Sequence, residues 1–157
     1  MNRKIILTED GSSSLFVEEL NEHYHSIHGA VQESLHIFIR AGLQNEIVRN
    51  LETINILEIG FGTGLNALLT YFFALETHNK IRYTAIEPYP LNSEEIQLLN
   101  YPDFIENLSA SSIFQQIHEN SWEEMKEIAQ HFSLCKHKQS ALEVPYPTLS
   151  LDRKSVV

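Results

Sequence analysis

The sequence predicts an α/β protein with a Rossmann-like, doubly wound sheet, on the strength of three neighbouring segments. Residues 55–59 are apolar and largely β-branched, as in a buried strand, and run directly into the glycine-rich segment 60–64. An apolar helix is expected over 65–75, and a second strand over 81–86 ends at Glu87. The order strand, glycine loop, helix, strand is typical of parallel sheets with crossover helices.

Composition indicates a single soluble domain. Of the 157 residues, 43% are hydrophobic and 20% are charged, which is ordinary for a globular protein. The apolar run at 65–75 is too short to cross a bilayer, and residues 1–10 lack the long apolar stretch of a signal peptide. The one cysteine, Cys135, has no partner for an internal disulfide. We therefore expect a cytoplasmic protein with no membrane partner.

The net charge of −10 argues against nucleic-acid binding through the overall electrostatic field. Only 11 lysine and arginine residues are spread along the chain, and phosphate contacts come mainly from these two residue types. A local basic patch remains compatible with this composition.

Helices and strands outside the glycine-loop region have weaker signals. A strand is expected over 4–7, a turn over 10–12, and a helix over 31–41 that stops at Gly42. Asn92 and Glu95 have the spacing of a capping box and open a further helix.

Ser121 and Glu124 repeat the capping-box spacing, so an amphipathic helix is expected with Trp122 and Met125 in the core. Strands are expected over 132–135 and 141–144. Residues 15–20 show no clear period and receive no assignment.

The glycine loop is the strongest sign of a ligand site. Glycines at alternate positions after a strand let the backbone turn sharply, and they leave no side chain to block a ligand. The N-terminus of the helix that follows favours polar or anionic groups. Glu87 stands 23 residues after Gly64, close to the spacing at which an acidic residue binds the ribose hydroxyls of a cofactor.

The glycine spacing separates two cofactor classes. A dinucleotide fingerprint requires its third glycine at position 65, where this chain has Leu65. Here the third glycine is Gly64, preceded by the acidic Glu58 and followed by Asn66. This pattern looks like the first motif of class I methyltransferases, which use S-adenosyl-L-methionine.

Three motifs follow one another along the chain. The first runs from Tyr24-His25-Ser26 through Gly29–Ser34 to Phe38-Ile39, the second is Gly60-Phe61-Gly62-Thr63-Gly64-Leu65-Asn66, and the third is Glu87-Pro88-Tyr89-Pro90-Leu91. Together they resemble one methyltransferase family, the methyltransferase domain of the MnmC proteins of tRNA 5-methylaminomethyl-2-thiouridine biosynthesis and its single-domain relatives. The second motif looks like the family's G-F-G-T-G-L-N loop and the third like its E-[KSP]-[FY]-P-L signature, and the resemblance covers about residues 10 to 145.

The resemblance implies a fold, a cofactor and a reaction. The fold is the Rossmann-like class I methyltransferase fold, and the cofactor is S-adenosyl-L-methionine. The reaction converts 5-aminomethyl-2-thiouridine to 5-methylaminomethyl-2-thiouridine at the wobble position of tRNA, and no metal is involved. The expected cofactor-binding residues are Glu58, Gly60, Phe61, Gly62, Thr63, Gly64, Asn66, Glu87 and Pro88.

Within this set, Glu87 is expected to bind the ribose and Glu58 the methionine ammonium group. The glycines are expected to shape the methionine end of the pocket. Tyr24 and Glu33 lie in a family-matching segment, and two interpretations stay open for them. They contact the cofactor or the target base, or Tyr24 is a packing residue and Glu33 a solvated helix position.

The family's catalytic aspartate is expected in a D-[AG]-F-x-P motif, which is absent from this sequence. We therefore expect no catalytic residue in this chain, a fold incomplete at its C-terminal side, and a methyltransferase domain over residues 1–151. Residues 152–157 resemble a translated sequencing adapter and are expected to be a non-native tail. Whether the intact protein carries a fused flavin-dependent oxidoreductase domain stays open.

Two other groups of residues receive non-catalytic interpretations. His23, His25 and His28 cluster, but no further ligand follows at a metal-binding spacing, so a polar loop near the cofactor is expected. Cys135 is expected to be a small core residue. Alternatives for function are a methyltransferase for a small molecule or protein, which the acidic charge favours, and an inactive cofactor-binding fragment.

Overall fold

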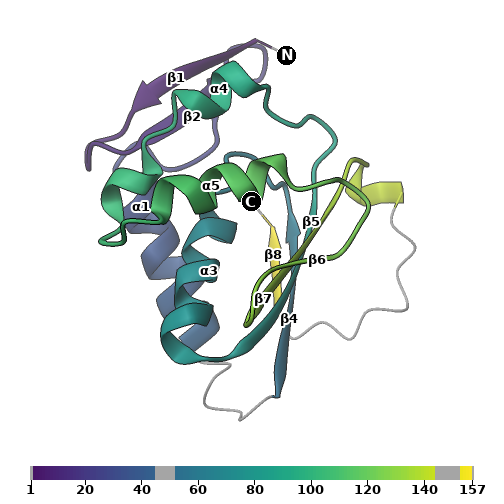
Figure 1. Ribbon diagram of the computed structural model, residues 1–157. Coiled ribbons are helices and arrows are strands. Elements are labelled where there is room, and N and C mark those ends of the chain that lie inside the picture. Colours follow the sequence, from purple (N-terminus) through teal and green to yellow (C-terminus); the bar gives the residue numbers. More distant parts are fainter. Residues whose placement is uncertain (1, 45–51, 144–152, 157) are drawn as a thin grey trace.

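Two sheets make up the strand structure of the protein. The computed structural model describes residues 2–44, 52–143 and 153–156 (Figure 1). A five-stranded sheet has the order β6-β7-β5-β4-β8, and a three-stranded sheet has the order β1-β2-β3. The strands of the larger sheet are β4 (Thr53–Ile59), β5 (Lys80–Ile86), β6 (Lys126–Ala129), β7 (Phe132–His137) and β8 (Arg153–Val156).

In the larger sheet, the strand order reverses at β4: later strands lie on both sides of it. The chain passes outward from β4 to β5 and then to β7, each pair being parallel, and β6 adds an antiparallel edge. On the opposite side β4 pairs in parallel with β8. In open α/β sheets, ligands bind beside the carboxyl ends of strands at such a switch point. The predicted strands at 55–59, 81–86 and 132–135 are confirmed.

Strand β8 lies in the segment that the sequence assigned to a non-native tail. Its backbone pairs Ile56 through Ile59 of β4 with residues 153–156. An open sheet edge offers unpaired N–H and C=O groups to any extended segment, whatever its origin. The assignment of residues 152–157 to a tail therefore stays a prediction.

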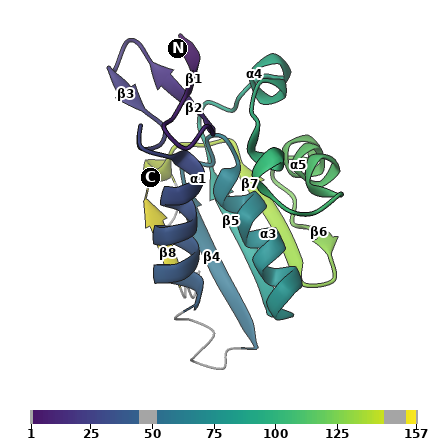
Figure 2. The same cartoon turned by 90° about the vertical axis from the view of Figure 1, so that its left-hand side faces the viewer.

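Helical segments α1 (Ala30–Glu33), η1 (Ser34–Leu43) and α3 (Leu65–Thr77) cover one face of the larger sheet (Figure 2). Segment α1 continues directly into the π-helical η1, so the helix predicted over 31–41 is confirmed. The predicted stop at Gly42 is wrong. Gly42 lies inside η1, without the positive φ by which a glycine ends a helix, and the N–H of Gln44 reaches back to the carbonyl of Ile39.

The hydrophobic core lies between these helices and the sheet. Alternate residues of β4 and β5, such as Ile56 and Tyr83, are at most 1% exposed and belong to the core cluster, as does Phe132 of β7. Leu57, next to Ile56, and Cys135, three positions after Phe132, point to the other face, because successive side chains of a strand alternate. Cys135 is buried, as the sequence predicted.

The smaller sheet consists of β1 (Arg3–Leu7), β2 (Ser13–Val17) and β3 (Glu22–His23). The strand and turn predicted at 4–7 and 10–12 are confirmed. Strand β2 received no sequence assignment because its first residues are buried serines rather than an alternating apolar pattern. One of them, Ser13, donates its backbone N–H to the side chain of Asn100 at 2.7 Å.

The two capping-box predictions have opposite outcomes. Asn92 and Glu95 form both reciprocal hydrogen bonds, at 2.9 and 2.8 Å, and open helix α4 (Ser93–Gln97). The helix predicted after Ser121 is wrong. Ser121 does donate to Glu124 at 3.2 Å, but Glu123 takes a positive φ of 66° and the chain then enters β6.

Trp122 and Met125 are therefore not core residues of a helix: Trp122 forms an isolated bridge with Lys136 of β7, and Met125 is exposed. The sequence interpretation also missed helix α5 (Ala110–Glu119).

Short 3-10 turns complete the described structure: η2 (Tyr101–Phe104) and η3 (Ala141–Glu143). The strand predicted over 141–144 is wrong for its first three residues, which form η3, and position 144 lies outside the described residues. Among the described helices, none is long and apolar enough to span a bilayer.

Helix α3 offers a matched test of the core. Leu68 is fully buried, whereas Leu75 on the same helix is 41% exposed. We expect Leu68→Ala to lower the free energy of unfolding by about 2–5 kcal/mol, because it removes buried contacts and leaves a cavity. Leu75→Ala is the control and should cost much less. Urea unfolding measures both, and equal losses would contradict this placement of the core.

Candidate functional site

A cavity of about 440 Å³ lies where the carboxyl ends of β4 and β5 meet the smaller sheet. Its walls come from four separate parts of the chain: the β2–β3 segment, the end of β4 with the loop and helix start that follow, the end of β5 with the residues after it, and two residues after β7. Of the predicted cofactor residues, those lining it are Glu58, Gly60, Phe61, Gly62, Thr63, Asn66, Glu87 and Pro88. Sequence-distant motifs are thus brought together at one site.

The glycine loop has a left-handed backbone at all three glycines, with φ of 88° at Gly60, 51° at Gly62 and 72° at Gly64. A Cβ on Gly62 would approach the Tyr24 ring to 3.2 Å, and one on Gly64 would approach His118 Nε2 to 2.9 Å. Gly64 does not line the cavity; it caps α3 and lets His118 approach. The missing side chains of the three glycines therefore allow close packing by Tyr24 and His118 and also keep the cavity open.

Glu87 connects the loop to the end of β5. Its Oε2 accepts the Gly62 N–H at 2.9 Å, and its Oε1 accepts the Tyr89 N–H at 2.8 Å. The residue is buried, yet it lines the cavity. A carboxylate oxygen has two lone pairs, so each oxygen can still accept one hydrogen bond from a ligand.

Glu58 lies deeper, at the end of β4, and is only 2% exposed. Burial raises the pKa of its carboxyl to about 8, against the lowering effect of hydrogen bonds from Asn66 and Tyr83; the Glu87 charge raises it further. The Asn66 amide donates to Glu58 Oε1 at 2.9 Å from the first turn of α3. A cationic ligand group beside this carboxyl would favour its ionised form.

Tyr24 and Glu33 have different places. Tyr24 lines the cavity, and its ring packs against Gly62. Burial raises the pKa of the Tyr24 hydroxyl. The Arg3 charge lowers this pKa, and the Glu87 charge raises it. Glu33 lies outside the lining and accepts the Ser26 N–H at 2.8 Å, so it holds the segment that follows Tyr24.

The histidine cluster divides in the structure. His23 and His25 line the cavity, whereas the exposed His28 pairs with Glu9. His25 Nε2 lies 2.9 Å from Thr63 Oγ1, and burial lowers its pKa to about 4, so the ring is neutral at neutral pH. In residues 2–44 and 52–143 no group of three metal-ligating side chains comes together.

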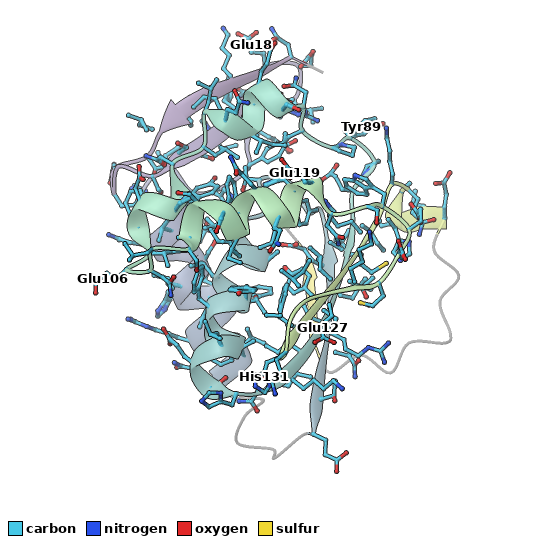
Figure 3. All side chains as sticks on the ribbon, viewed as in Figure 1. Glu18, Tyr89, Glu106, Glu119, Glu127 and His131 are labelled. Carbon is cyan, nitrogen blue, oxygen red and sulfur yellow. The ribbon has the colours of Figure 1, made fainter. Side chains whose placement is uncertain are left out.

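Several lining residues were not among the expected site residues. Tyr89 belongs to the motif at 87–91 but was not expected in the cavity, whereas Leu20, between β2 and β3, and Glu22, which begins β3, had no functional signal. Ser140 and Ala141, after β7, also line the cavity; Ala141 was missed because 141–144 was read as a strand instead of η3, and Ser140 had no assignment. Tyr89 is 59% exposed and projects outward beyond β5 (Figure 3).

Similar proteins were found by sequence and by structure, while no protein-family model matches the chain. The tRNA 5-methylaminomethyl-2-thiouridine biosynthesis bifunctional protein MnmC of Leptospira interrogans is 39% identical over 84 residues, which are 50% of this chain and 13% of that protein. The MnmC protein of Burkholderia thailandensis is 32% identical over 98 residues, 59% of this chain and 14% of that protein.

The resemblance to the MnmC family is confirmed. The chain is also similar to the crystal structure of MnmC2 from Aquifex aeolicus, with a TM-score of 0.68 and 24% identity over 92% of this chain and 46% of that chain. At this identity the MnmC2 likeness shows the fold, and it confirms the predicted Rossmann-like α/β fold. The chain spans less than one-seventh of the length of these two bifunctional MnmC relatives.

The buried Glu58 carboxyl makes the stability of the fold depend on pH. Its pKa is about 8 in the folded protein and near 4.5 when unfolded, so between these values the folded state holds a proton that the unfolded chain has lost. Stability should therefore fall as pH rises through this window. We expect Glu58→Gln to flatten this fall, because glutamine mimics the protonated carboxyl.

Urea unfolding at pH 5, 6, 7 and 8 measures the effect. Glu119→Gln, at the exposed end of α5, is the control and should keep the wild-type slope. Parallel slopes for wild type and Glu58→Gln would contradict the burial of an ionisable group at this position.

Proposed function

We propose that the protein is an S-adenosyl-L-methionine-dependent methyltransferase of tRNA wobble-uridine modification. The observation that carries the proposal is the pair of acidic side chains, Glu58 and Glu87, on the wall of one cavity behind the glycine loop. The two carboxyls suit the two ends of this cofactor: an ammonium group on its methionine and hydroxyl groups on its ribose.

The residues present fit the cofactor. Glu87 is already fixed by two backbone N–H groups, so its oxygens accept ribose hydroxyls without reorganisation. Glu58 is a buried carboxyl that gains a cationic partner, and Asn66 orients it from α3. Gly60 and Gly62 line the cavity without adding side chains of their own.

When bound, S-adenosyl-L-methionine supplies a methyl group on an electrophilic sulfonium. The contribution of this chain is then to bind and orient that group and to exclude water. Phe61 and Leu65 give the cavity an apolar wall, and Tyr24 closes the loop side over Gly62. No residue of the chain is proposed as a catalytic acid or base; the proposed domain comprises residues 1–151.

The proposed acceptor is the exocyclic amine of 5-aminomethyl-2-thiouridine in tRNA, giving 5-methylaminomethyl-2-thiouridine. This acceptor is supported by the names of the MnmC relatives together with the matching motifs. A cytoplasmic location follows from a tRNA substrate.

One observation favours a second candidate, a methyltransferase for a small molecule or protein. The net charge is −10, and acidic residues lie exposed on separate elements. Glu18, Glu106, Glu119 and Glu127 are examples (Figure 3). Such a surface repels the phosphates of RNA unless a local basic region offsets it.

Glu87 provides the test of cofactor binding. We expect Glu87→Ala to weaken S-adenosyl-L-methionine binding by about 1–3 kcal/mol, the effect of removing a charged hydrogen-bond acceptor. Isothermal titration calorimetry measures the affinity, and Glu94→Ala, exposed on α4, is the control. A wild-type protein that binds no cofactor would overturn the proposed function, leaving an inactive fragment.

The acceptor is tested by transfer of radiolabelled methyl groups. We expect label to enter tRNA that carries 5-aminomethyl-2-thiouridine and to be lost after ribonuclease pretreatment. Unmodified tRNA is the control. Labelling that survives ribonuclease would favour the small-molecule or protein candidate, and cofactor binding without any transfer would contradict an active tRNA methyltransferase.

A further inference from the structure

Arg3 lies on β1, far in sequence from every motif of the cofactor site, yet its side chain is only 7% exposed. Its Nη1 contacts both carboxylate oxygens of Glu95, at 3.2 and 3.1 Å, and its Nη2 donates to the carbonyl of Tyr89. The guanidinium also lies beside the Tyr24 hydroxyl and lowers the pKa of that hydroxyl. Arg3 thus links β1 to α4 and to the residues after β5, and its bonds to Glu95 and Tyr89 offset the cost of burying the charge.

These contacts belong to a closed chain of interactions around Glu87. Arg3 holds the Tyr89 carbonyl, while the N–H of the same Tyr89 donates to Glu87 Oε1 at 2.8 Å. The other oxygen, Oε2, accepts from Gly62 at 2.9 Å, and the Tyr24 ring lies against Gly62. The Tyr24 hydroxyl in turn lies beside the Arg3 guanidinium, which lowers its pKa, and this contact closes the chain.

We infer that Arg3 is a positioning residue for the ribose-binding carboxylate: it holds Tyr89, whose N–H orients Glu87, and it contacts Tyr24, whose ring lies against the other donor, Gly62. This inference rests on the proposed cofactor. Glu95 anchors the guanidinium from α4, where the same carboxylate also closes the capping box with Asn92. The smaller sheet therefore acts on the cofactor without a direct contact between Arg3 and the ligand.

Arginine is suited to this position for a geometric reason. Its planar fork presents donors in several fixed directions, whereas a lysine ammonium is a single point charge on a flexible stem. Lysine would keep the charge near Glu95 and Tyr24 but would not serve the carboxylate, the hydroxyl and the carbonyl together. Arg3→Lys should therefore restore only part of the function lost in Arg3→Met.

The test is a double-mutant cycle on S-adenosyl-L-methionine affinity, measured by calorimetry. We expect Arg3→Met to weaken binding about tenfold, as for the loss of a hydrogen bond to a charged group, and Arg3→Lys to weaken it less. In a Glu87→Ala background Arg3→Met should have no further effect, because its only route to the cofactor has gone. Lys4→Met, exposed on the same strand, is the control and should bind as wild type.

The outcomes separate the inference from the proposed function. If wild type binds no cofactor, the proposed function fails. If wild type binds but Arg3→Met binds equally well, or loses as much affinity in the Glu87→Ala background as in wild type, the positioning role is wrong. Should Arg3→Met fail to fold, Arg3→Lys takes its place, because it keeps the charge but not the planar fork, and wild-type affinity in that variant would overturn the inference.

Discussion

The site depends on one carboxylate that ties two backbone segments together. Glu87 accepts N–H groups from Gly62, in the loop after β4, and from Tyr89, just beyond β5. Its own N–H donates to the carbonyl of His137, at the end of β7, at 2.9 Å. Three strand ends are thereby linked through one residue, and the loop keeps a fixed shape where the strands no longer pair with one another.

A second buried ionic group supports the loop from the other side. Lys136 of β7 is fully buried, and its Nζ donates to the carbonyls of Ile117 and His118 at 2.8 and 2.7 Å. These carbonyls lie at the C-terminal end of α5, where a positive charge is favourable. The same Nζ lies 5.4 Å from the centre of the Phe61 ring, and His118 Nε2 is 3.1 Å from the Thr63 carbonyl. Helix α5, β7 and the glycine loop thus form one packed unit.

The residues that fix the shape of the cavity differ from those that line it. Gly64 and Lys136 act through packing and helix ends, and neither lines the cavity. Glu58 and Glu87 line the cavity and supply its two carboxyl groups. Burial lowers the pKa of His118 to about 4, with a further lowering from the Lys136 charge, so a neutral imidazole packs beside the loop. The glycine loop therefore has one cationic side chain beside it, Lys136, and not a second one from His118.

Much of the fold was determined by local patterns in the sequence. The strand over 55–59, the glycine loop, the helix that follows and the capping box at Asn92 depend on neighbouring residues alone, and each is present. The motif Glu87-Pro88 was found for the same reason. The same local rule failed at Ser121, because pairing of Trp122 and β6 with β7 outweighed a helix-start signal.

The tertiary structure alone decided which distant residues meet. No local pattern relates Arg3 to Tyr89, Lys136 to the end of α5, or Ser140 to the cavity, since each contact joins segments that only folding brings together. The glycines show the same division: their spacing predicted a ligand loop, but the approach of Tyr24 to Gly62 and of His118 to Gly64 depends on packing between segments. The sequence determines which residues carry polar and charged groups, and long-range packing determines where these groups lie. Contacts between distant segments produce no periodic pattern along the chain, so local sequence patterns do not reveal them.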